Sequence, residues 1–320
     1  MNFKKTRTAS IIFIVLVILM FFIFVADISP NEEKEIFVVP QNSTSTEYIV
    51  NKLSDQSFIS SNWLFNSILS ITGLKEIKSG GYLINKGTSL FNIVGILSNE
   101  PELAWISIPE GLRKEEIAEI ISKKLNWSTK QKNRFLNAHN NDDYKEGVYF
   151  PETYLVPKKE SGADMAERMI SKFNEKFKTL SQDFKKENLK WTTGLKLASI
   201  VQREASNEKE MPLVAGILWN RLLDDMKLQV DASLQYAVGK TEEGWWEPVE
   251  AETKEIDSLY NTYKYKGLPP TPICNPGLSA IKSALNPKET DCIYYIHSDN
   301  KIYCSDNYDK HLENINRYLK

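Results

Sequence analysis

The sequence predicts an α+β protein that follows an N-terminal transmembrane helix, and three features support this fold class. The chain has 320 residues, of which 42% are hydrophobic and 26% are charged, so it can bury a core large enough for about two domains. In the first half, short alternating apolar runs come before runs with helical spacing, and in the second half helical spacing dominates until a hairpin-like segment near the end. A charge-free stretch precedes both halves. We therefore expect an anchor, a β/α region and a mixed α+β domain.

The charge-free stretch covers residues 9–26 and is just long enough to cross a hydrocarbon core of roughly 30 Å. Basic residues precede it and acidic residues follow it, which predicts a cytoplasmic tail (1–8), a transmembrane helix (9–28), a linker (29–35) and an extracytoplasmic remainder. A signal peptide cut after residue 26 would have Phe24 at the −3 position, where a small residue is needed. An uncleaved anchor is therefore favoured over a cleaved signal peptide.

The region 36–130 contains weak internal repetition. Segments 36–53, 82–97 and 105–125 each open with a short apolar strand, turn at Pro, Asn or Gly, and close with apolar residues at helical spacing. Apolar residues at helical spacing within 59–69 predict a further helix between the first two segments. These small β-turn-α units resemble LysM-like modules, which grip chains of N-acetyl sugars. A purely structural stalk is the alternative.

A second domain is predicted over residues 145–320, after a polar stretch at 126–143 where we place the boundary. We expect a mixed α+β domain. In chain order it should contain an extended segment (147–157), a helix with apolar residues from Met165 to Leu180, a helix that ends near Glu204, a helix over 210–224, an irregular loop (260–277), a short helix (278–285) and a hairpin that begins at Cys292.

Charge and cysteine usage exclude some functions. A formal net charge of −2 provides no basic surface for nucleic acid, and three scattered histidines lack ligand-like spacing, so we expect no metal site. Cys292 and Cys304 flank a segment that alternates like a hairpin, which favours them as the disulfide pair in an oxidising compartment. Three buried thiols, with Cys274 as the third, are the alternative.

Glu204 is the candidate catalytic residue, because it extends an apolar stripe. On a helix, Leu197, Ile200 and Val201 lie seven, four and three residues before it, so all four share one core-facing side. Burial raises the pKa of a carboxyl group because it disfavours the charged form, and a general acid near neutral pH needs such a raised pKa. The alternative is a snorkelling or cap-bonded side chain without a catalytic role.

Seven short motifs in order carry a family resemblance: KEGVYFPETY, LASIVQRE, EMPLVAGILWNRL, LQVD, SLYNTYKYKGLPP, NPG and CIYYI. Together they resemble the endolytic murein transglycosylase family, also called MltG or YceG-like proteins. The resemblance implies a single-pass enzyme of the bacterial cytoplasmic (inner) membrane, with its catalytic domain outside the cytoplasm. Such an enzyme cuts nascent peptidoglycan strands within the chain, needs no cofactor, and has cell-wall synthases (penicillin-binding proteins) as partners.

The resemblance also assigns roles to residues. The last residue of the family's ASIVEKE-like motif, its catalytic glutamate, falls on Glu204, and Gln202 replaces the motif's earlier glutamate. A second departure is Thr271, where the family usually has Gly after GLPP, and it puts only the local turn in doubt. The residues that match the LQxD step and the YNTY loop, and that we expect to line the sugar groove, are Gln229, Asp231, Tyr260, Asn261, Thr262 and Tyr263.

A single acid suffices for the reaction that the resemblance implies. Neutral Glu204 would protonate the oxygen between N-acetylmuramic acid (MurNAc) and N-acetylglucosamine (GlcNAc), and its carboxylate would then accept the proton of the muramoyl 6-hydroxyl as a 1,6-anhydro ring closes. Asp231 or Asn261 could stabilise the charged sugar, or could be turn and cap residues. One alternative is a muramidase, a hydrolase with Glu210 or Asp231 as second carboxylate. The other is a noncatalytic glycan-binding scaffold.

Overall fold

The computed structural model describes residues 12–15, 33–42, 45–139, 145–299 and 301–319. Apart from residues 12–15, the predicted transmembrane helix lies outside the described residues. Among the helices that are described, none combines the length and the apolar character that crossing a membrane requires.

The described chain forms two compact units. Unit 1 contains residues up to 106 together with 153–160, and unit 2 contains residues 107–152 and 161–320. This division differs from the predicted boundary at 126–143. The polar stretch contains helix α6 (Thr129–Leu136), whose Phe135 is fully buried and which packs between α5 (Lys114–Leu125) and α7 (Gly162–Lys178).

Unit 1 is built on a four-stranded sheet with the order β1-β2-β3-β4. The strands are β1 (Glu35–Val39), β2 (Gly80–Ile84), β3 (Leu103–Ser107) and β4 (Thr153–Pro157). β1 pairs antiparallel with β2, with Phe37 opposite Tyr82, and β2 pairs antiparallel with β3. Phe37 and Tyr82 are both fully buried, whereas Ile36 is 49% exposed, so β1 alternates as a strand with one buried face should.

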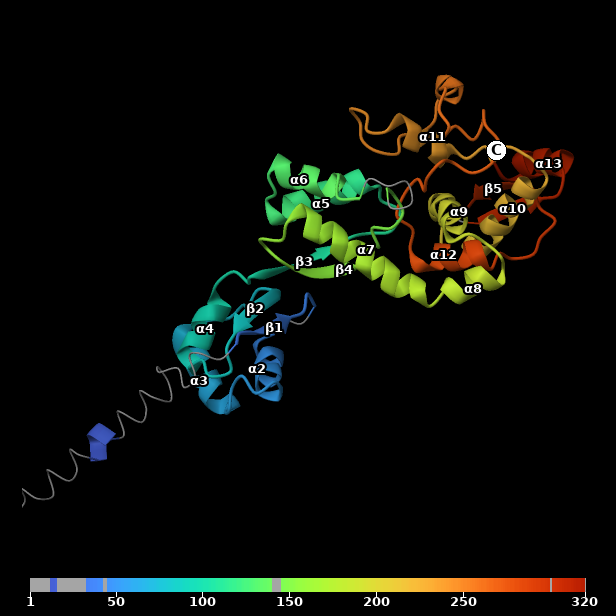
Figure 1. Cartoon of the computed structure of the whole chain (residues 1–320). Coiled ribbons are helices and arrows are strands. Elements are labelled where there is room, and N and C mark those ends of the chain that lie inside the picture. The colour runs from blue at the N-terminus through green and yellow to red at the C-terminus, as the bar shows by residue number, and fades with distance from the viewer. Residues whose placement is uncertain (1–11, 16–32, 43–44, 140–144, 300, 320) are drawn as a thin grey trace, which may run out of the picture. The chain divides into compact units, whose positions relative to one another are not determined.

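Three helices complete unit 1: α2 (Thr46–Asp55), α3 (Asn62–Thr72) and α4 (Leu90–Ser98). Their buried apolar residues share one core with β1 and β2. Ser45 and Ser61 begin α2 and α3, since each hydroxyl accepts a hydrogen bond from a backbone N–H three residues on. Every strand and helix predicted between 36 and 98 is therefore present (Figure 1).

Unit 2 is mostly helical. Besides α5, α6 and α7 it contains α8 (Ser181–Lys186), α9 (Trp191–Glu204), α10 (Met211–Leu223), α11 (Asp231–Val238), a 3₁₀ helix η2 (Glu252–Glu255), α12 (Leu278–Leu285), α13 (Tyr308–Tyr318) and a hairpin of β5 (Tyr294–Ser298) and β6 (Lys301–Ser305). The predicted α9, α10, α12 and hairpin are confirmed, whereas α6, α8, α11 and α13 were not predicted.

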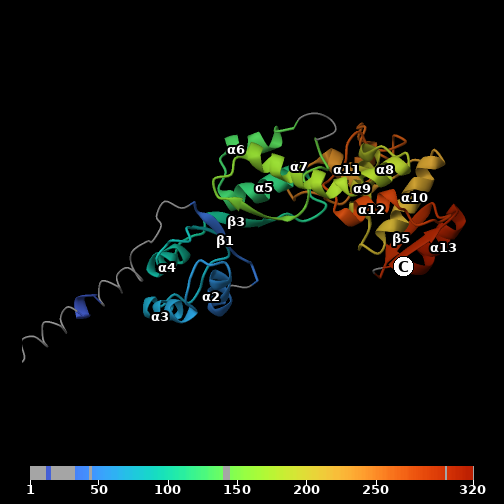
Figure 2. The same cartoon turned by 60° about the horizontal axis from the view of Figure 1, so that its bottom comes forward.

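Helix α9 is central to unit 2, because it packs against α10, α11 and α12. Figures 1 and 2 both show α9 beside α10 and α12, and α13 next to β5.

The predicted disulfide between Cys292 and Cys304 is confirmed, and Cys274 is a buried free thiol. Arg221 of α10 joins this helix to the hairpin, since its Nε donates to the Ile293 carbonyl at 2.6 Å. Helix α9 and the hairpin are thus both packed or bonded to α10.

Candidate functional site

Glu204 is the last residue of α9. Leu197, Ile200 and Val201 are all fully buried, so the predicted apolar face of this helix is confirmed. Glu204 itself is half-buried, because the chain leaves the helix at Ala205 in an extended conformation. A core helix therefore carries the carboxyl group to the edge of the core.

Tyr295 of β5 contacts this carboxyl group directly. Its hydroxyl donates a hydrogen bond of 2.6 Å to Glu204 Oε2. Burial, together with the charge of Glu204, raises the pKa of Tyr295 well above its usual value, so the hydroxyl stays protonated and remains a donor. The same carboxyl group also interacts with the Ala232 N–H and lines the groove described below.

The pKa of Glu204 is raised above its usual value, chiefly because burial penalises the charged carboxylate. The negative charge of Asp231 raises it further. The hydrogen bond from Tyr295, the charge of His297 and the Ala232 N–H act in the opposite direction but do not cancel the effect of burial. A carboxyl group with a raised pKa can hold a proton near neutral pH and can deliver it as a general acid.

Glu204 opens into a groove of about 590 Å³. Three of the predicted binding residues line the groove with it, namely Gln229, Asp231 and Tyr263. Tyr263 donates a hydrogen bond of 2.6 Å to Asp231 Oδ1, which orients the second carboxylate of the groove. The remaining walls come from Arg203, Arg221, Ala232, Gln235, Tyr294, Tyr295, Tyr308 and His311.

The other three predicted binding residues are not among the residues that line this groove. Asn261 is fully buried, and its amide donates to the carbonyls of Lys254 and Ile256. Thr262 Oγ1 accepts from the Val230 N–H at 2.9 Å, and the Tyr260 hydroxyl lies 2.8 Å from Thr271 Oγ1. These contacts fix the loop that presents Tyr263 and the LQVD step.

The two candidate second carboxylates also differ in position. Asp231 lines the groove, whereas Glu210 is 9% exposed and is not among its lining residues. Glu210 Oε2 accepts from the Ser206 N–H and lies 3.2 Å from His297 Nε2. Glu210 therefore stabilises the start of α10, and only Asp231 shares the groove with Glu204.

Sequence reasoning missed Tyr295 and Arg203 as site residues. The CIYYI motif does place Tyr295 on a strand, but periodicity cannot say which helix that strand contacts 91 residues away. Arg203 directly precedes Glu204, and its only sequence signal is that position.

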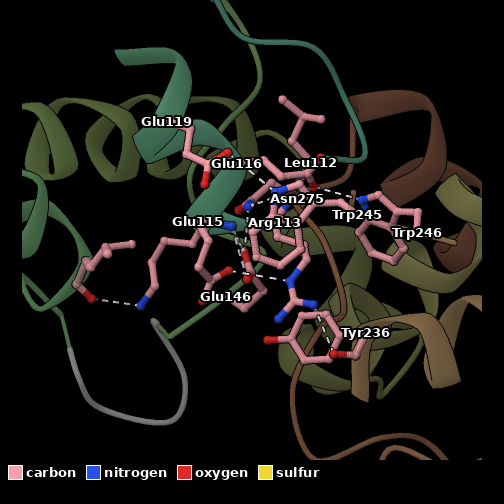
Figure 3. Close-up of polar contacts among 12 residues, drawn as sticks. Leu112, Arg113, Glu115, Glu116, Glu119, Glu146, Tyr236, Trp245, Trp246 and Asn275 are labelled. Carbon is pink, nitrogen blue, oxygen red and sulfur yellow. Dashed lines mark hydrogen bonds and ion pairs between the residues drawn. The ribbon is translucent and has the colours of Figure 1, made fainter. Parts of the chain in front are cut away.

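Outside the groove, Glu146 is a second buried carboxyl group (Figure 3). It is 1% exposed, and its Oε1 accepts from Asn275 Nδ2 at 2.6 Å and from the Lys114 N–H at 3.2 Å. Burial, with a smaller contribution from Glu115, raises its pKa to about 7. The Lys114 N–H is shared between Oε1 and Oε2, and Oε1 also accepts from the Gly147 N–H, so a glutamine with its carbonyl oxygen at the Oε1 position keeps most of these hydrogen bonds.

Glu146→Gln should therefore flatten the dependence of stability on pH. A pKa of about 7 in the folded state exceeds the usual 4.5, so the folded protein loses stability as pH rises through that interval. The full loss would be roughly 3 kcal/mol at 1.36 kcal/mol per pKa unit. Urea unfolding between pH 5 and pH 8 measures it, with exposed Glu187→Gln as control. Parallel curves for wild type and Glu146→Gln would contradict the expectation.

Comparison with known proteins identifies the family of this chain. Residues 37–317 match the YceG-like family. The endolytic murein transglycosylase of Bacillus subtilis (strain 168) is 30% identical over 286 residues, which cover 82% of this chain and 78% of the relative.

Two more distant relatives also match this chain over most of its length. The endolytic murein transglycosylase of Streptococcus pneumoniae serotype 2 (strain D39) is 25% identical over 91% of this chain, and the match spans 60% of the pneumococcal protein. A crystal structure of a yceG-like protein from Listeria monocytogenes has a TM-score of 0.62 at 25% identity, covering 88% of this chain and 98% of that chain. Because the match extends over both units, this chain belongs to the YceG-like family.

Proposed function

We infer that this chain is an endolytic murein transglycosylase, a lyase that cuts bonds between MurNAc and GlcNAc within nascent glycan strands and so limits strand length. The observation that carries this function is the half-buried Glu204, whose raised pKa and open groove suit a general acid. The names of the relatives from B. subtilis and S. pneumoniae support the same activity.

The reaction needs one proton donor that later acts as a base. Protonated Glu204 gives its proton to the glycosidic oxygen, the bond to the anomeric carbon of MurNAc breaks, and the GlcNAc portion leaves with a new hydroxyl group. The muramoyl 6-hydroxyl then attacks the anomeric carbon, and its proton goes to the Glu204 carboxylate. Glu204 is thereby reprotonated, no water is consumed, and the product ends in 1,6-anhydroMurNAc.

Gln229, Asp231 and Tyr263 line the same groove, and we propose that they contact the sugars. The charge of Asp231 is suited to stabilise the oxocarbenium-like sugar, because the positive charge develops within the groove. Tyr260, Asn261 and Thr262 would then act indirectly, through the loop that they fix.

The position of Asp231 keeps a muramidase as a second candidate function, since the groove contains two carboxylates. Mass spectrometry of strands digested by the full chain distinguishes the two. Anhydro ends support the transglycosylase, and reducing ends with one added water would replace it with the muramidase. Binding without any cleavage would establish the noncatalytic scaffold.

We propose that residues 9–28 anchor the chain in the bacterial cytoplasmic membrane, with the catalytic unit outside and cell-wall synthases as partners. The charge-free stretch with basic residues before it supports this topology. N-terminal sequencing of the protein from membrane fractions should find residues 1–28 intact. Recovery of a soluble chain that starts near residue 27 would overturn the anchor.

We further propose that unit 1 grips the glycan strand in the manner of a LysM-like module. A groove of about 550 Å³ in this unit combines hydroxyl groups with apolar side chains, the combination that suits sugar rings. The hydroxyl groups come from Ser54, Ser57, Ser60, Thr88 and Ser89, and the apolar side chains from Phe58, Ile59, Leu64 and Leu90.

Because β4 returns to the sheet of unit 1, a deletion would cut through both units, and substitutions are the better test. The double variant Ser60→Ala/Thr88→Val should weaken binding of long strands roughly 5- to 150-fold, since two hydrogen bonds are lost at about 0.5–1.5 kcal/mol each. Ser70→Ala/Thr72→Val, on α3 outside the groove, is the matched control. Binding is measured with long strands in a Glu204→Gln background, and equal affinities of the two double variants would indicate a structural stalk.

A further inference from the structure

A loop with two adjacent tryptophans lies next to the groove. This tryptophan loop, residues 239–250, connects α11 to η2. Trp246 Nε1 donates to Glu116 Oε2 at 2.8 Å, and its carbonyl accepts from Gln235 Nε2 at 3.0 Å. Trp246 has a φ of 65°, in the left-handed region that a bulky residue adopts only when its surroundings hold it. These contacts fix the position of the indole ring.

The neighbouring residues reinforce that position. The Arg113 guanidinium lies 4.0 Å from the ring of Tyr236 and 4.8 Å from the ring of Trp245. Figure 3 shows Arg113 next to Tyr236, with Trp245 and Trp246 directed toward Glu116 and Glu119 of α5. The tryptophan loop is thus held against α5 and α11 by hydrogen bonds and ring contacts.

Arg203 stacks on the Trp246 ring of this loop. Its guanidinium carbon lies 4.0 Å from the centre of the Trp246 ring, and its side chain lines the groove that contains Glu204. Within the part of the chain that the structure describes, the side chain of Arg203 forms neither a hydrogen bond nor an ion pair, and its Nε is buried without a partner. A stacked arginine with unused donors at the wall of a groove is prepared to bind an oxygen-rich group.

The other charged or titratable groups of the groove differ from Arg203 in their contacts or charge. Arg221 donates through Nε and Nη1 to the carbonyls of Ile293 and Leu228. The pKa of His311 is lowered, first by burial and then by Arg221, which favours the neutral ring. Glu204 and Asp231 each accept a tyrosine hydroxyl and bear negative charge when ionised. Among the described lining residues, Arg203 is therefore the arginine whose guanidinium donates no hydrogen bond within the protein.

We propose that Arg203 binds the lactyl branch of the muramoyl unit and thereby selects the bond that Glu204 cuts. This inference rests on the proposed transglycosylase function. MurNAc differs from GlcNAc by this branch, which ends in a carboxylate or, where a stem peptide is attached, in an amide carbonyl followed by peptide carboxylates. A planar guanidinium matches such oxygens by paired hydrogen bonds. Recognition next to Glu204 places a muramoyl sugar, rather than a GlcNAc, at the acid.

Arg203→Gln in the full chain tests this proposal on two substrates, namely strands with stem peptides and strands from which an amidase has removed them. We expect KM to rise roughly 10- to 100-fold, as for loss of a charge-assisted hydrogen bond, with kcat changed less than about 3-fold. The pH profile of kcat should not move, since the pKa of Glu204 is set chiefly by burial, with contributions from Tyr295 and Asp231. Arg203→Lys, which keeps the charge but loses the planar fork, should have an intermediate KM.

The two substrates distinguish whether Arg203 binds oxygen atoms of the lactyl group or of the stem peptide. A rise in KM on both substrates assigns the lactyl group, and a rise on stem-bearing strands alone assigns the peptide carboxylates. An unchanged KM on both substrates, or a fall in kcat with a shifted pH profile, would overturn the proposal. Arg134→Gln, an exposed arginine of α6, controls for the change in charge. If Arg203→Gln does not fold, Arg203→Lys decides, because a KM equal to that of wild type contradicts the proposal.

Failure of the proposed function would give a different experimental result. If wild-type protein releases no anhydro ends, the transglycosylase assignment fails before any variant is compared. If wild type releases them and Arg203→Gln does so with unchanged KM, only the role of Arg203 fails.

Discussion

Glu204→Gln should reduce the release of anhydro ends by at least roughly 10²- to 10⁴-fold, the usual contribution of a general acid or base. Glutamine keeps the shape of the side chain and can still accept the hydrogen bond from Tyr295, so the fold should persist. It cannot transfer a proton to the leaving oxygen. Because the same carboxyl group also serves as the base, one substitution removes both roles, and the upper end of this range is the better expectation.

The measurement uses the full chain with polymerised glycan strands, and mass spectrometry of the products. Circular dichroism checks that the variant is folded. Glu208→Gln is the control, because Glu208 is exposed on the turn after α9 and is not among the groove residues. Glu210→Gln is a poorer control, since the contact of Glu210 with Ser206 supports the start of α10. Near-wild-type release of anhydro ends by folded Glu204→Gln would refute both the mechanism and the site.

The part of the site that sequence could predict depends on local periodicity. Leu197, Ile200 and Val201 recur at helical spacing, and this spacing is a property of the helix itself. The position of Glu204 at the end of a buried face therefore followed from its own segment. The hairpin around residue 299 and the pairing of Cys292 with Cys304 were predictable for the same reason, because strand alternation and a tight turn are local.

The contacts that complete the site are long-range. Tyr295 meets Glu204 across 91 positions, and Trp246 meets Glu116 across 130. Neither partner carries a local signal for the other, because a tyrosine on a half-buried strand or a tryptophan in a loop has many suitable partners. Such pairs depend on how the helices pack, which single-sequence periodicity does not specify.

Polar composition does not reveal two features of the structure. Residues 126–143 contain few apolar side chains, yet Phe135 alone gives α6 a buried contact, so the stretch is partly helical. In the YNTY loop, Asn261 and Thr262 have side chains suited to sugars, but their hydrogen bonds are used within the loop. A polar side chain in a buried loop satisfies backbone groups before it can contact a ligand.

Tyr295→Phe should lower the rate of strand cleavage roughly 10- to 100-fold, the range for loss of a hydrogen bond to a charged group. The hydroxyl of Tyr295 orients Glu204 by binding Oε2, and it stabilises the carboxylate that later accepts the muramoyl proton. Phenylalanine keeps the aromatic ring, so the half-buried hairpin should remain folded. A slower proton transfer with an intact fold is the expected combination.

The pH profile distinguishes this positioning role from a loss of packing. The hydrogen bond from Tyr295 lowers the pKa of Glu204, so its removal raises that pKa further. Activity requires protonated Glu204 and falls as pH rises through its pKa; the alkaline limb of kcat/KM in Tyr295→Phe should therefore move to higher pH. Tyr303→Phe, which removes a hydroxyl from the same hairpin outside the groove, should leave the profile in place. If Tyr295→Phe loses rate while its alkaline limb coincides with that of wild type, Tyr295 supports the fold and does not tune the acid.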